Sequence, residues 1–219
     1  MNTNLQMKPH DTKGILITFC GLDGCGKTTM IQWLREALEQ EGFDAALTKQ
    51  PTNHMRQSHI FRTYMDQEDH SGYSYRSLSL MAAADRIQHC NHTILPVLNK
   101  GTVLISDRYF YSCLANLRAR GFQEDRWVYE IAKNEIPKPD LAFFLDTEVE
   151  TAMIRVRQRP EERDRYVDTE LQYRLRDEYL KICADNNGIL VSTDQDPTET
   201  FAEILYHVKR VMEDKKNGK

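Results

Sequence analysis

The segment that most constrains the fold is a glycine-rich loop, residues 21–28, which reads GLDGCGKT. Its spacing, G-x-x-x-x-G-K-[ST], lets backbone N–H groups turn inward around phosphates, while the lysine reaches the β- and γ-phosphates and the hydroxyl ligates Mg²⁺. The loop therefore predicts a site for ATP and Mg²⁺ between a buried strand and a helix whose N-terminal dipole faces the anion. The residues expected to contact ATP are Gly21, Asp23, Gly24, Cys25, Gly26, Lys27, Thr28 and Thr29.

Three residues of this loop have individual predictions. Lys27 is expected to act on the phosphoryl group during transfer, and Thr28 is expected to bind Mg²⁺. Cys25 has two interpretations: a thiolate in a positive environment, or a small residue that fits the turn.

Short apolar runs alternate with longer helical patterns around this loop. Runs rich in Ile, Val, Leu and Phe are typical of strands covered on both faces; they occupy residues 14–20, 43–48, 102–106, 141–145 and 188–191. Helical patterns occupy residues 27–41, 75–98, 109–120, 126–134, 148–159, 168–186 and 197–215. The alternation predicts an α/β fold with a parallel sheet and right-handed crossovers.

The length of 219 residues suits a single domain. We expect a polar N-terminal tail over 1–13, one domain over 14–212 and a polar C-terminal tail over 213–219, with both ends frayed. Pro160 ends a helix and opens a connection, so a lid is expected at about 155–167.

Composition excludes several classes of protein. Apolar residues make up 40% of the chain and charged residues 28%, and the net charge of −4 gives no reason to expect a nucleic-acid partner. No apolar run is long enough to cross a membrane, and residues 1–13 lack the apolar centre of a signal peptide. The five cysteines are scattered without a C-x-x-C pair, which favours reduced thiols in a cytoplasmic protein.

A second acidic group stands at the end of an apolar strand. Residues 103–107 read VLISD, and Arg108 follows at once. In proteins with this phosphate loop such an acid helps to hold Mg²⁺, so Asp107 is a metal-binding candidate. Arg108 suits a second phosphate and is a catalytic candidate. The alternative is that Asp107 caps the next helix. Asp146 ends another strand, and we expect it to be structural, as a helix cap.

An arginine-rich segment follows the fifth helical pattern. Residues 155–165 read RVRQRPEERDR. Arg155 and Arg159 are i,i+4 neighbours on a helix, while Arg163 and Arg165 follow Pro160 in the predicted lid. A closing lid can add charge at the γ-phosphate and exclude water, so Arg163 and Arg165 are catalytic candidates. The alternative is a solvated charged turn, because acidic residues are interspersed.

The order of these motifs resembles that of the thymidylate kinase family of nucleoside monophosphate kinases. The resemblance is carried by GLDGCGKTT at 21–29, by the Ala-Asp-Arg that ends at Arg86, by Asp-Arg-Tyr at 107–109 with Ser112, by residues 139–146 and by the arginine lid. It spans residue 14 to about residue 205. It implies a P-loop NTPase fold with a five-stranded parallel sheet flanked by helices on both faces, a homodimer, and Mg²⁺-dependent phosphoryl transfer from ATP to dTMP.

The resemblance also implies roles for individual residues. Asp23 would contact the 3′-hydroxyl of the acceptor's sugar, and a lid arginine would stabilise the transferring group. Arg86 and Arg108 would grip the phosphate and base of the acceptor. The full set expected to bind the acceptor is Asp23, Gln50, Pro51, Arg86, Asp107, Arg108, Ser112 and Asn116.

Three positions depart from the family pattern, all on the acceptor side. Gln50 stands where the family often has Glu, Ala82 where it has a Phe that stacks on thymine, and Asn116 within a stretch that is commonly Ala-Tyr-Gln. Tyr73, Tyr75 or Tyr109 could replace the missing aromatic ring. The alternatives are therefore a related kinase with another nucleotide or deoxynucleoside acceptor, or a nucleotide-binding protein that is not a kinase.

Overall fold

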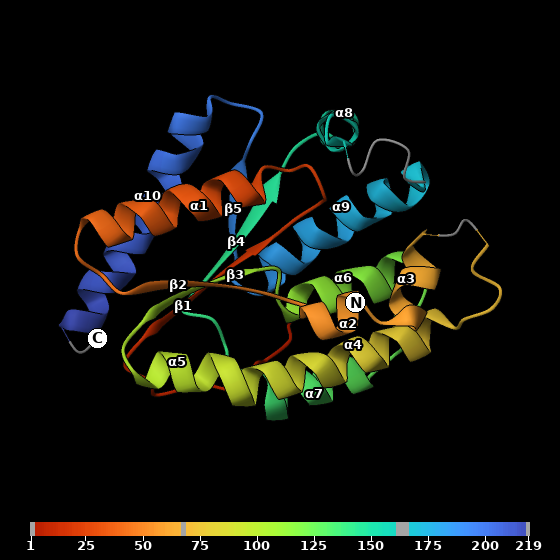
Figure 1. The fold of residues 1–219 in the computed structure, drawn as a ribbon, viewed down its shortest axis with the longest axis horizontal. Coiled ribbons are helices and arrows are strands. Elements are labelled where there is room, and N and C mark those ends of the chain that lie inside the picture. The colour runs from red at the N-terminus through yellow and green to blue at the C-terminus, as the bar shows by residue number, and fades with distance from the viewer. Residues whose placement is uncertain (1–2, 67–68, 161–166, 218–219) are drawn as a thin grey trace.

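The centre of the fold is a five-stranded sheet in which every pairing is parallel. Figure 1 shows the strands of the sheet between layers of helices. The computed structural model describes residues 3–66, 69–160 and 167–217. The strands are β1 (Ile15–Cys20), β2 (Ala45–Lys49), β3 (Val103–Asp107), β4 (Leu141–Asp146) and β5 (Ile189–Ser192), in the order β2-β3-β1-β4-β5. All six residues of β1 are buried, as expected for a central strand covered on both faces. The predicted α/β fold is confirmed.

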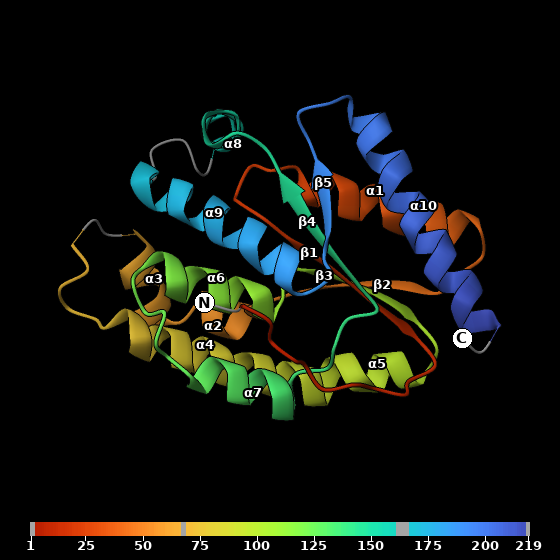
Figure 2. The ribbon, with the colours of Figure 1, turned by 180° about the vertical axis from the view of Figure 1, so that it is seen from behind.

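Helices cover both faces of the sheet (Figures 1 and 2). Helix α1 (Lys27–Gln40) packs beside α10 (Pro197–Lys216) on one face, and α4 (Tyr75–His89), α6 (Phe110–Ala119) and α9 (Thr169–Asp185) lie on the other. The shorter helices are α2 (Asn53–Arg56), α3 (His59–Asp66), α5 (Leu95–Asn99), α7 (Trp127–Glu135) and α8 (Val149–Arg157). No helix within the described ranges is long and apolar enough to cross a membrane.

The helix predicted over 75–98 is a composite. A π-helical turn, η1 (Cys90–Ile94), separates α4 from α5. Pro96 stands in the first turn of α5, where its missing N–H removes one helical hydrogen bond. The wider π-helical turn just before Pro96 continues the helix, so apolar periodicity alone could not show where α4 ends and α5 begins.

Helices α2 and α3 were not anticipated from the sequence, because each is too short to show a clear helical period. They pack against α4 in a small apolar cluster, separate from the main core, whose buried members are Met55, Tyr64, Leu78 and Ala82. The backbone N–H of Thr52 donates to Asp85 on α4 at 2.8 Å, which ties the start of α2 to that helix. We call this unit the α2–α3 cluster.

Within residues 3–217 both ends contact the rest of the fold, whereas we expected frayed tails. Leu5 and Met7 are buried, and the backbone N–H of Thr3 donates to Asp185 at 2.7 Å. At the other end α10 continues to Lys216, and Lys215 contacts Asp140 at 3.2 Å. The expectation was wrong because two apolar residues at alternate positions were too weak a signal against a polar background.

Candidate active site

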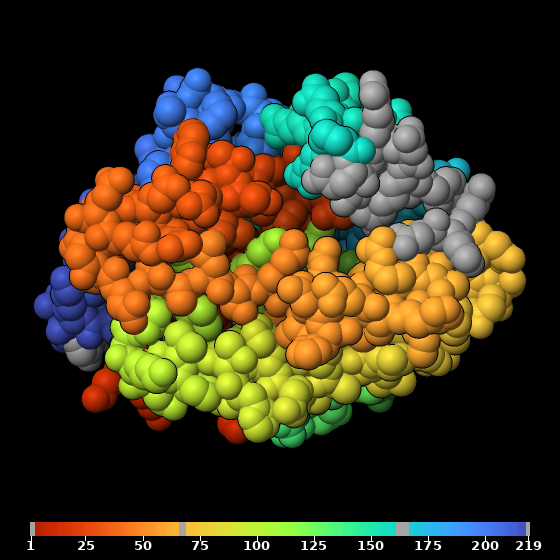
Figure 3. Space-filling view, in the orientation of Figure 1, coloured from red at the N-terminus to blue at the C-terminus, as the bar shows by residue number. Residues whose placement is uncertain are grey.

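The carboxyl ends of the parallel strands meet at one edge of the sheet, where the chain turns from β1 into the glycine loop. Strand β1 lies between β3 and β4, so the chain leaves it at the point where the sheet order reverses, the usual place for a ligand site in such folds. A cleft with an empty volume of about 1420 Å³ opens there. Figure 3 shows a hollow in this face between the orange segments of the first third of the chain and the teal α8.

Glycine is required in the loop for steric reasons. Gly24 has φ +85°, and a Cβ there would lie 2.1 Å from the carbonyl oxygen of Ala152 in α8. Gly26, with φ 88°, is the N-cap residue of α1, and in the described structure no side chain caps that helix. The first-turn N–H groups of α1 are thus directed at the cleft, where a phosphate would accept them.

Lys27 is buried at the floor of the loop and lines the cleft. Its Nζ donates to the carbonyl oxygens of Gly21 at 3.2 Å and Leu22 at 2.6 Å. Cys25 is buried behind it, with Sγ 3.5 Å from Lys27 Nζ, and fits the interpretation of a small residue that packs in the turn.

The predicted ATP contacts divide into two groups. Asp23, Gly24, Gly26, Lys27 and Thr28 line the cleft. Gly21 and Cys25 lie beneath the surface of the loop, and Thr29 is exposed on α1 outside the cleft lining.

Asp107 is placed to hold a cation. Its Oδ2 pairs with Lys49 Nζ at 2.8 Å, while its Oδ1 is buried and has no partner among the described atoms. Burial alone would raise the pKa of this carboxyl group, but the nearby charges of Lys27, Arg108 and Lys49 outweigh it and lower the pKa. Asp107 does not cap α6, because Tyr109 is the N-cap residue and no side-chain cap is present there.

The donor set at this point fits Mg²⁺. Thr28 and Asp107 both line the cleft, and they offer a hydroxyl and an ionised carboxylate with an unpartnered oxygen. Hard divalent cations prefer such oxygen ligands.

Arg108 connects the glycine loop to the far wall of the cleft. It has φ 67°, a left-handed conformation that is uncommon outside glycine, and its own N–H donates to the carbonyl of Phe19 at 2.8 Å. Its Nη2 donates to Asp23 at 2.6 Å and its Nη1 donates to the Tyr179 hydroxyl at 2.8 Å. The Tyr179 hydroxyl in turn donates to Ser112 at 3.0 Å.

Two further predicted residues lie deeper in the cleft. Arg86 is 4% exposed; its Nη1 donates to the carbonyl of Ala82 at 2.9 Å, and its Nε has no partner among the described atoms. Asn116 accepts a hydrogen bond from Arg120 at 2.6 Å. Pro51 also lines the cleft.

The prediction that the Gln50 side chain contacts the acceptor in the cleft is wrong. Its side chain is fully buried and does not line the cleft, although its neighbours Lys49 and Pro51 do. Its Nε2 lies 3.1 Å from His89 Nδ1. Successive side chains at a strand end point to opposite sides, so the Gln50 side chain enters the space between β2 and α4.

The lid is described only up to residue 160. Helix α8 ends at Arg157, so Arg155 and Arg159 do not share its face as expected; Arg155 Nη2 donates to the carbonyl of Thr193 at 3.0 Å, and Arg159 lines the cleft. Arg163 and Arg165 lie outside the described residues. Asp146 is structural as expected, through a bidentate pair with Arg176 at 2.8 and 2.9 Å, but it does not cap α8.

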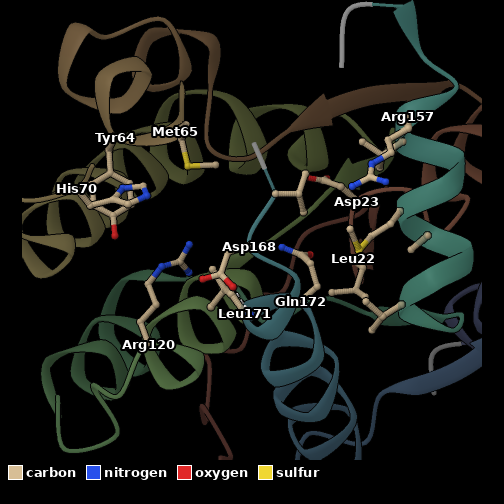
Figure 4. A pocket seen from close by; sticks show the side chains of 15 residues that line it. Leu22, Asp23, Tyr64, Met65, His70, Arg120, Arg157, Asp168, Leu171 and Gln172 are labelled. Carbon is tan, nitrogen blue, oxygen red and sulfur yellow. Dashed lines mark hydrogen bonds between the residues drawn. The ribbon is translucent and has the colours of Figure 1, made fainter. Parts of the chain in front are cut away.

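A smaller pocket adjoins the cleft at Asp23. Figure 4 shows Tyr64, Met65 and His70 on one side of it and Leu22, Asp23 and Arg157 on the other. Apart from Arg157, the wall that α8 provides is apolar, made of Val149, Ala152, Met153 and Val156. Because Leu22, Asp23, Met65, Arg120 and Gln172 line both spaces, the pocket is an extension of the cleft.

Comparison with known proteins agrees with this geometry. The family model described as thymidylate kinase matches residues 19–204. The chain belongs to the thymidylate kinase family. It is 40% identical to a protein named probable thymidylate kinase from Pyrococcus horikoshii, over 78% of this chain and 83% of the relative. It is 31% identical to the protein named thymidylate kinase from Halothermothrix orenii, over 90% of this chain and 97% of the relative.

In this member of the thymidylate kinase family the structure adds cleft residues that sequence reasoning missed. They include Lys49, Arg56, Phe61, Arg62, Arg120 and Gln172. Lys49 had a usable signal, because it ends the strand beside β3. The others come from α3, from the ends of α2 and α6, and from the first turn of α9, where only the three-dimensional arrangement brings them to the cleft.

Proposed function

We propose that this chain transfers the γ-phosphoryl group of ATP to dTMP, giving ADP and dTDP. The observation that carries the proposal is the contact of 2.6 Å between Arg108 and Asp23. It joins a guanidinium suited to the acceptor's phosphate to the loop that is suited to the donor's phosphates, so both substrates would meet in one cleft.

On the donor side, the N–H groups of the loop and the first turn of α1 would hold the β- and γ-phosphates, and Lys27 would leave its carbonyl partners to pair with them. Thr28 and Asp107 would hold Mg²⁺, which supplies charge neutralisation at the phosphate oxygens when bound. Phosphoryl transfer needs positioning and charge more than covalent chemistry, and this chain offers both.

On the acceptor side, the phosphate of dTMP is itself the nucleophile and needs no general base. Arg108 would fix it in line with the γ-phosphate, Asp23 would accept a hydrogen bond from the 3′-hydroxyl, and Arg86 would donate to the base from its buried Nε. The lid arginines Arg163 and Arg165 remain our candidates for the charge that stabilises the transferring group, and Arg159 supports a lid role because it lines the cleft.

We also propose that the protein is a homodimer that pairs through α4. The exposed stripe of this helix begins at Arg76, whose charge is paired with Asp125, and carries no charge beyond it. Its other members are Ser77, Leu80, Met81, Ala84 and Gln88. Leu80 and Met81 are 43% and 40% exposed, which is unusual for large apolar side chains side by side on a helix.

A cytoplasmic location is supported by the five free cysteines.

A coupled assay of ADP release tests the proposed function. We would compare dTMP with dUMP, dGMP, dCMP, AMP and thymidine, each with ATP and Mg²⁺, in the wild-type chain and in Lys27→Ala. We expect turnover with dTMP that Lys27→Ala abolishes. Turnover only with another acceptor would show that this acceptor, and not dTMP, is the substrate. A rate of ADP release that is the same with and without every acceptor would refute kinase activity.

A further inference from the structure

We propose that Phe61 of α3 is the aromatic side chain against which the acceptor's base stacks. The inference rests on the proposed function, because it presumes a nucleotide in the cleft. It assigns a specificity-determining role to the α2–α3 cluster, a unit that the sequence did not reveal.

Elimination among the aromatic side chains points to Phe61. In the described part of the chain the aromatic residues that line the cleft itself are Phe61, Tyr75 and Tyr179. Tyr64 lines only the adjoining pocket, and its ring centroid lies 4.2 Å from that of His70. Tyr179 already has partners within the protein. Its hydroxyl forms hydrogen bonds with Arg108 and Ser112, and its ring packs edge-on against Phe144 with 6.4 Å between the ring centroids.

Tyr75 has a partner as well, because the Arg120 guanidinium lies 4.1 Å from its ring centroid. The ring of Phe61, by contrast, has no aromatic or cationic side chain against it within the described residues. Tyr73 and Tyr109, the other substitutes considered from the sequence, do not line the cleft, and Tyr109 is fully buried in the core.

The surroundings of Phe61 fit a planar base. The ring packs on the α2–α3 cluster, and Ala82, one of the buried members of that cluster, also lines the cleft. Beside Tyr75 and Leu78, α4 contributes two small side chains to this wall, Ser79 and Ala82, and Arg86 follows Ala82 one turn further along the helix. A base that accepts a hydrogen bond from the unpartnered Nε of Arg86 would therefore lie along the wall that Phe61 forms.

In this proposal two helices recognise the base, α4 through a hydrogen bond and α3 through stacking. Arg86 on α4 reads an acceptor atom at the edge of the base, and Phe61 on α3 covers a face. Loss of one base–aromatic stack weakens binding by roughly tenfold or more. Because α3 carries the ring, binding of the base would also hold α3 against α4.

The test compares Phe61→Leu with Phe61→Tyr, with Ile60→Ala as the matched control. Leu keeps an apolar side chain on the cluster but removes the ring; Tyr keeps the ring. Ile60 packs on the same cluster without lining the cleft. We expect Phe61→Leu to raise the KM for dTMP about tenfold with little change in kcat or in the KM for ATP, and we expect Phe61→Tyr and Ile60→Ala to resemble the wild type.

A second readout separates stacking from a structural role. 2-Deoxyribose 5-phosphate, a competitor without a base, should inhibit the wild type and Phe61→Leu with the same inhibition constant. An equal weakening of this competitor, or an unchanged KM for dTMP in Phe61→Leu, would overturn the inference while the wild-type turnover left the proposed function intact. Absence of wild-type turnover with every acceptor would instead refute the proposed function, and the inference with it.

The ring can also be relocated. Ala82→Phe places a ring on the α4 side of the same cluster, so the double variant Phe61→Leu/Ala82→Phe should recover most of the lost affinity for dTMP. Ala82→Phe alone should crowd the cluster and raise the KM. Failure of the double variant to improve on Phe61→Leu would count against stacking as the source of the effect.

Discussion

Tyr179 of α9 accepts a hydrogen bond from Arg108 at 2.8 Å, and so holds the guanidinium that also bonds Asp23. Helix α9 begins at Thr169, directly after the residues that we predicted to form a lid. The hydroxyl of Tyr179 therefore links the helix that follows the predicted lid to the arginine that we propose binds the acceptor's phosphate.

Tyr179→Phe should raise the KM for dTMP by about tenfold and leave the KM for ATP nearly unchanged, because a hydrogen bond to a charged group is worth roughly 1.5–3 kcal/mol. The ring keeps its packing against Phe144. Tyr173→Phe is the matched control, since Tyr173 lies on the same helix but is exposed and bonds Glu150. Equal KM values in the two variants would show that Tyr179 does not position Arg108.

Lys49→Met should move the acid limb of the kcat/KM profile to higher pH. Asp107 must be ionised to hold Mg²⁺, and its pKa is lowered because the neighbouring positive charges outweigh its burial. Removing Lys49 takes away one of those charges, so the pKa rises and activity is lost at a higher pH as the solution is acidified. Lys100→Met, at the C-terminal end of α5, should leave the limb in place.

The same change has a consequence for stability. The folded pKa of Asp107 lies below its unfolded value, so its contribution is present above the unfolded pKa and is lost as the pH falls through the folded pKa. Lys49→Met should therefore reduce the stability advantage of neutral over acidic solution, measured by denaturant unfolding at several pH values. An identical pH dependence in the wild type and variant would contradict the role of Lys49.

Gly24→Ala and Gly42→Ala form a matched pair, because φ is +85° at Gly24 and +84° at Gly42. A Cβ at Gly42 meets nothing within 4 Å, so that variant reports only backbone strain, about 1 kcal/mol. A Cβ at Gly24 would strike the carbonyl of Ala152, so it should destabilise the fold more and abolish activity. Thermal unfolding and ADP release would measure both, and equal losses would mean that the loop tolerates the contact.

Leu80→Arg should convert the proposed homodimer to a monomer, because it places a charge without a partner in the middle of the apolar part of the α4 stripe. Sedimentation velocity would measure the change. Ile154→Arg, at an equally apolar and 59% exposed position on α8, is the control that should not alter assembly. A wild-type monomer at micromolar concentration would refute the proposed interface.

The sheet could be predicted closely from the sequence because its strands are continuous apolar runs. Each of the five strands was placed within two residues of its observed ends. The place of the glycine loop between β1 and α1 could also be predicted, because the loop is a local motif whose conformation depends on neighbouring residues in the chain.

The acceptor side could not be predicted as well, because it is assembled from distant segments. Gln50 was expected in the cleft, but its side chain turns inward to His89, a contact set by how α4 packs on β2. Phe61 was missed because α3 gains its place only by packing on Met55 and Leu78. Neither relationship leaves a period or a spacing in the sequence.

The separateness of the α2–α3 cluster affects how the protein opens. Its few buried side chains are shared with α4 and not with the main core, so α2 and α3 are held by much less buried apolar surface than the strands. Amide hydrogens of residues 53–66 should therefore exchange with solvent through local opening, while those of β1 and β3 should exchange only through global unfolding. A bound acceptor nucleotide would slow the exchange of residues 53–66. The affinity for the acceptor would then depend on the local stability of α2 and α3.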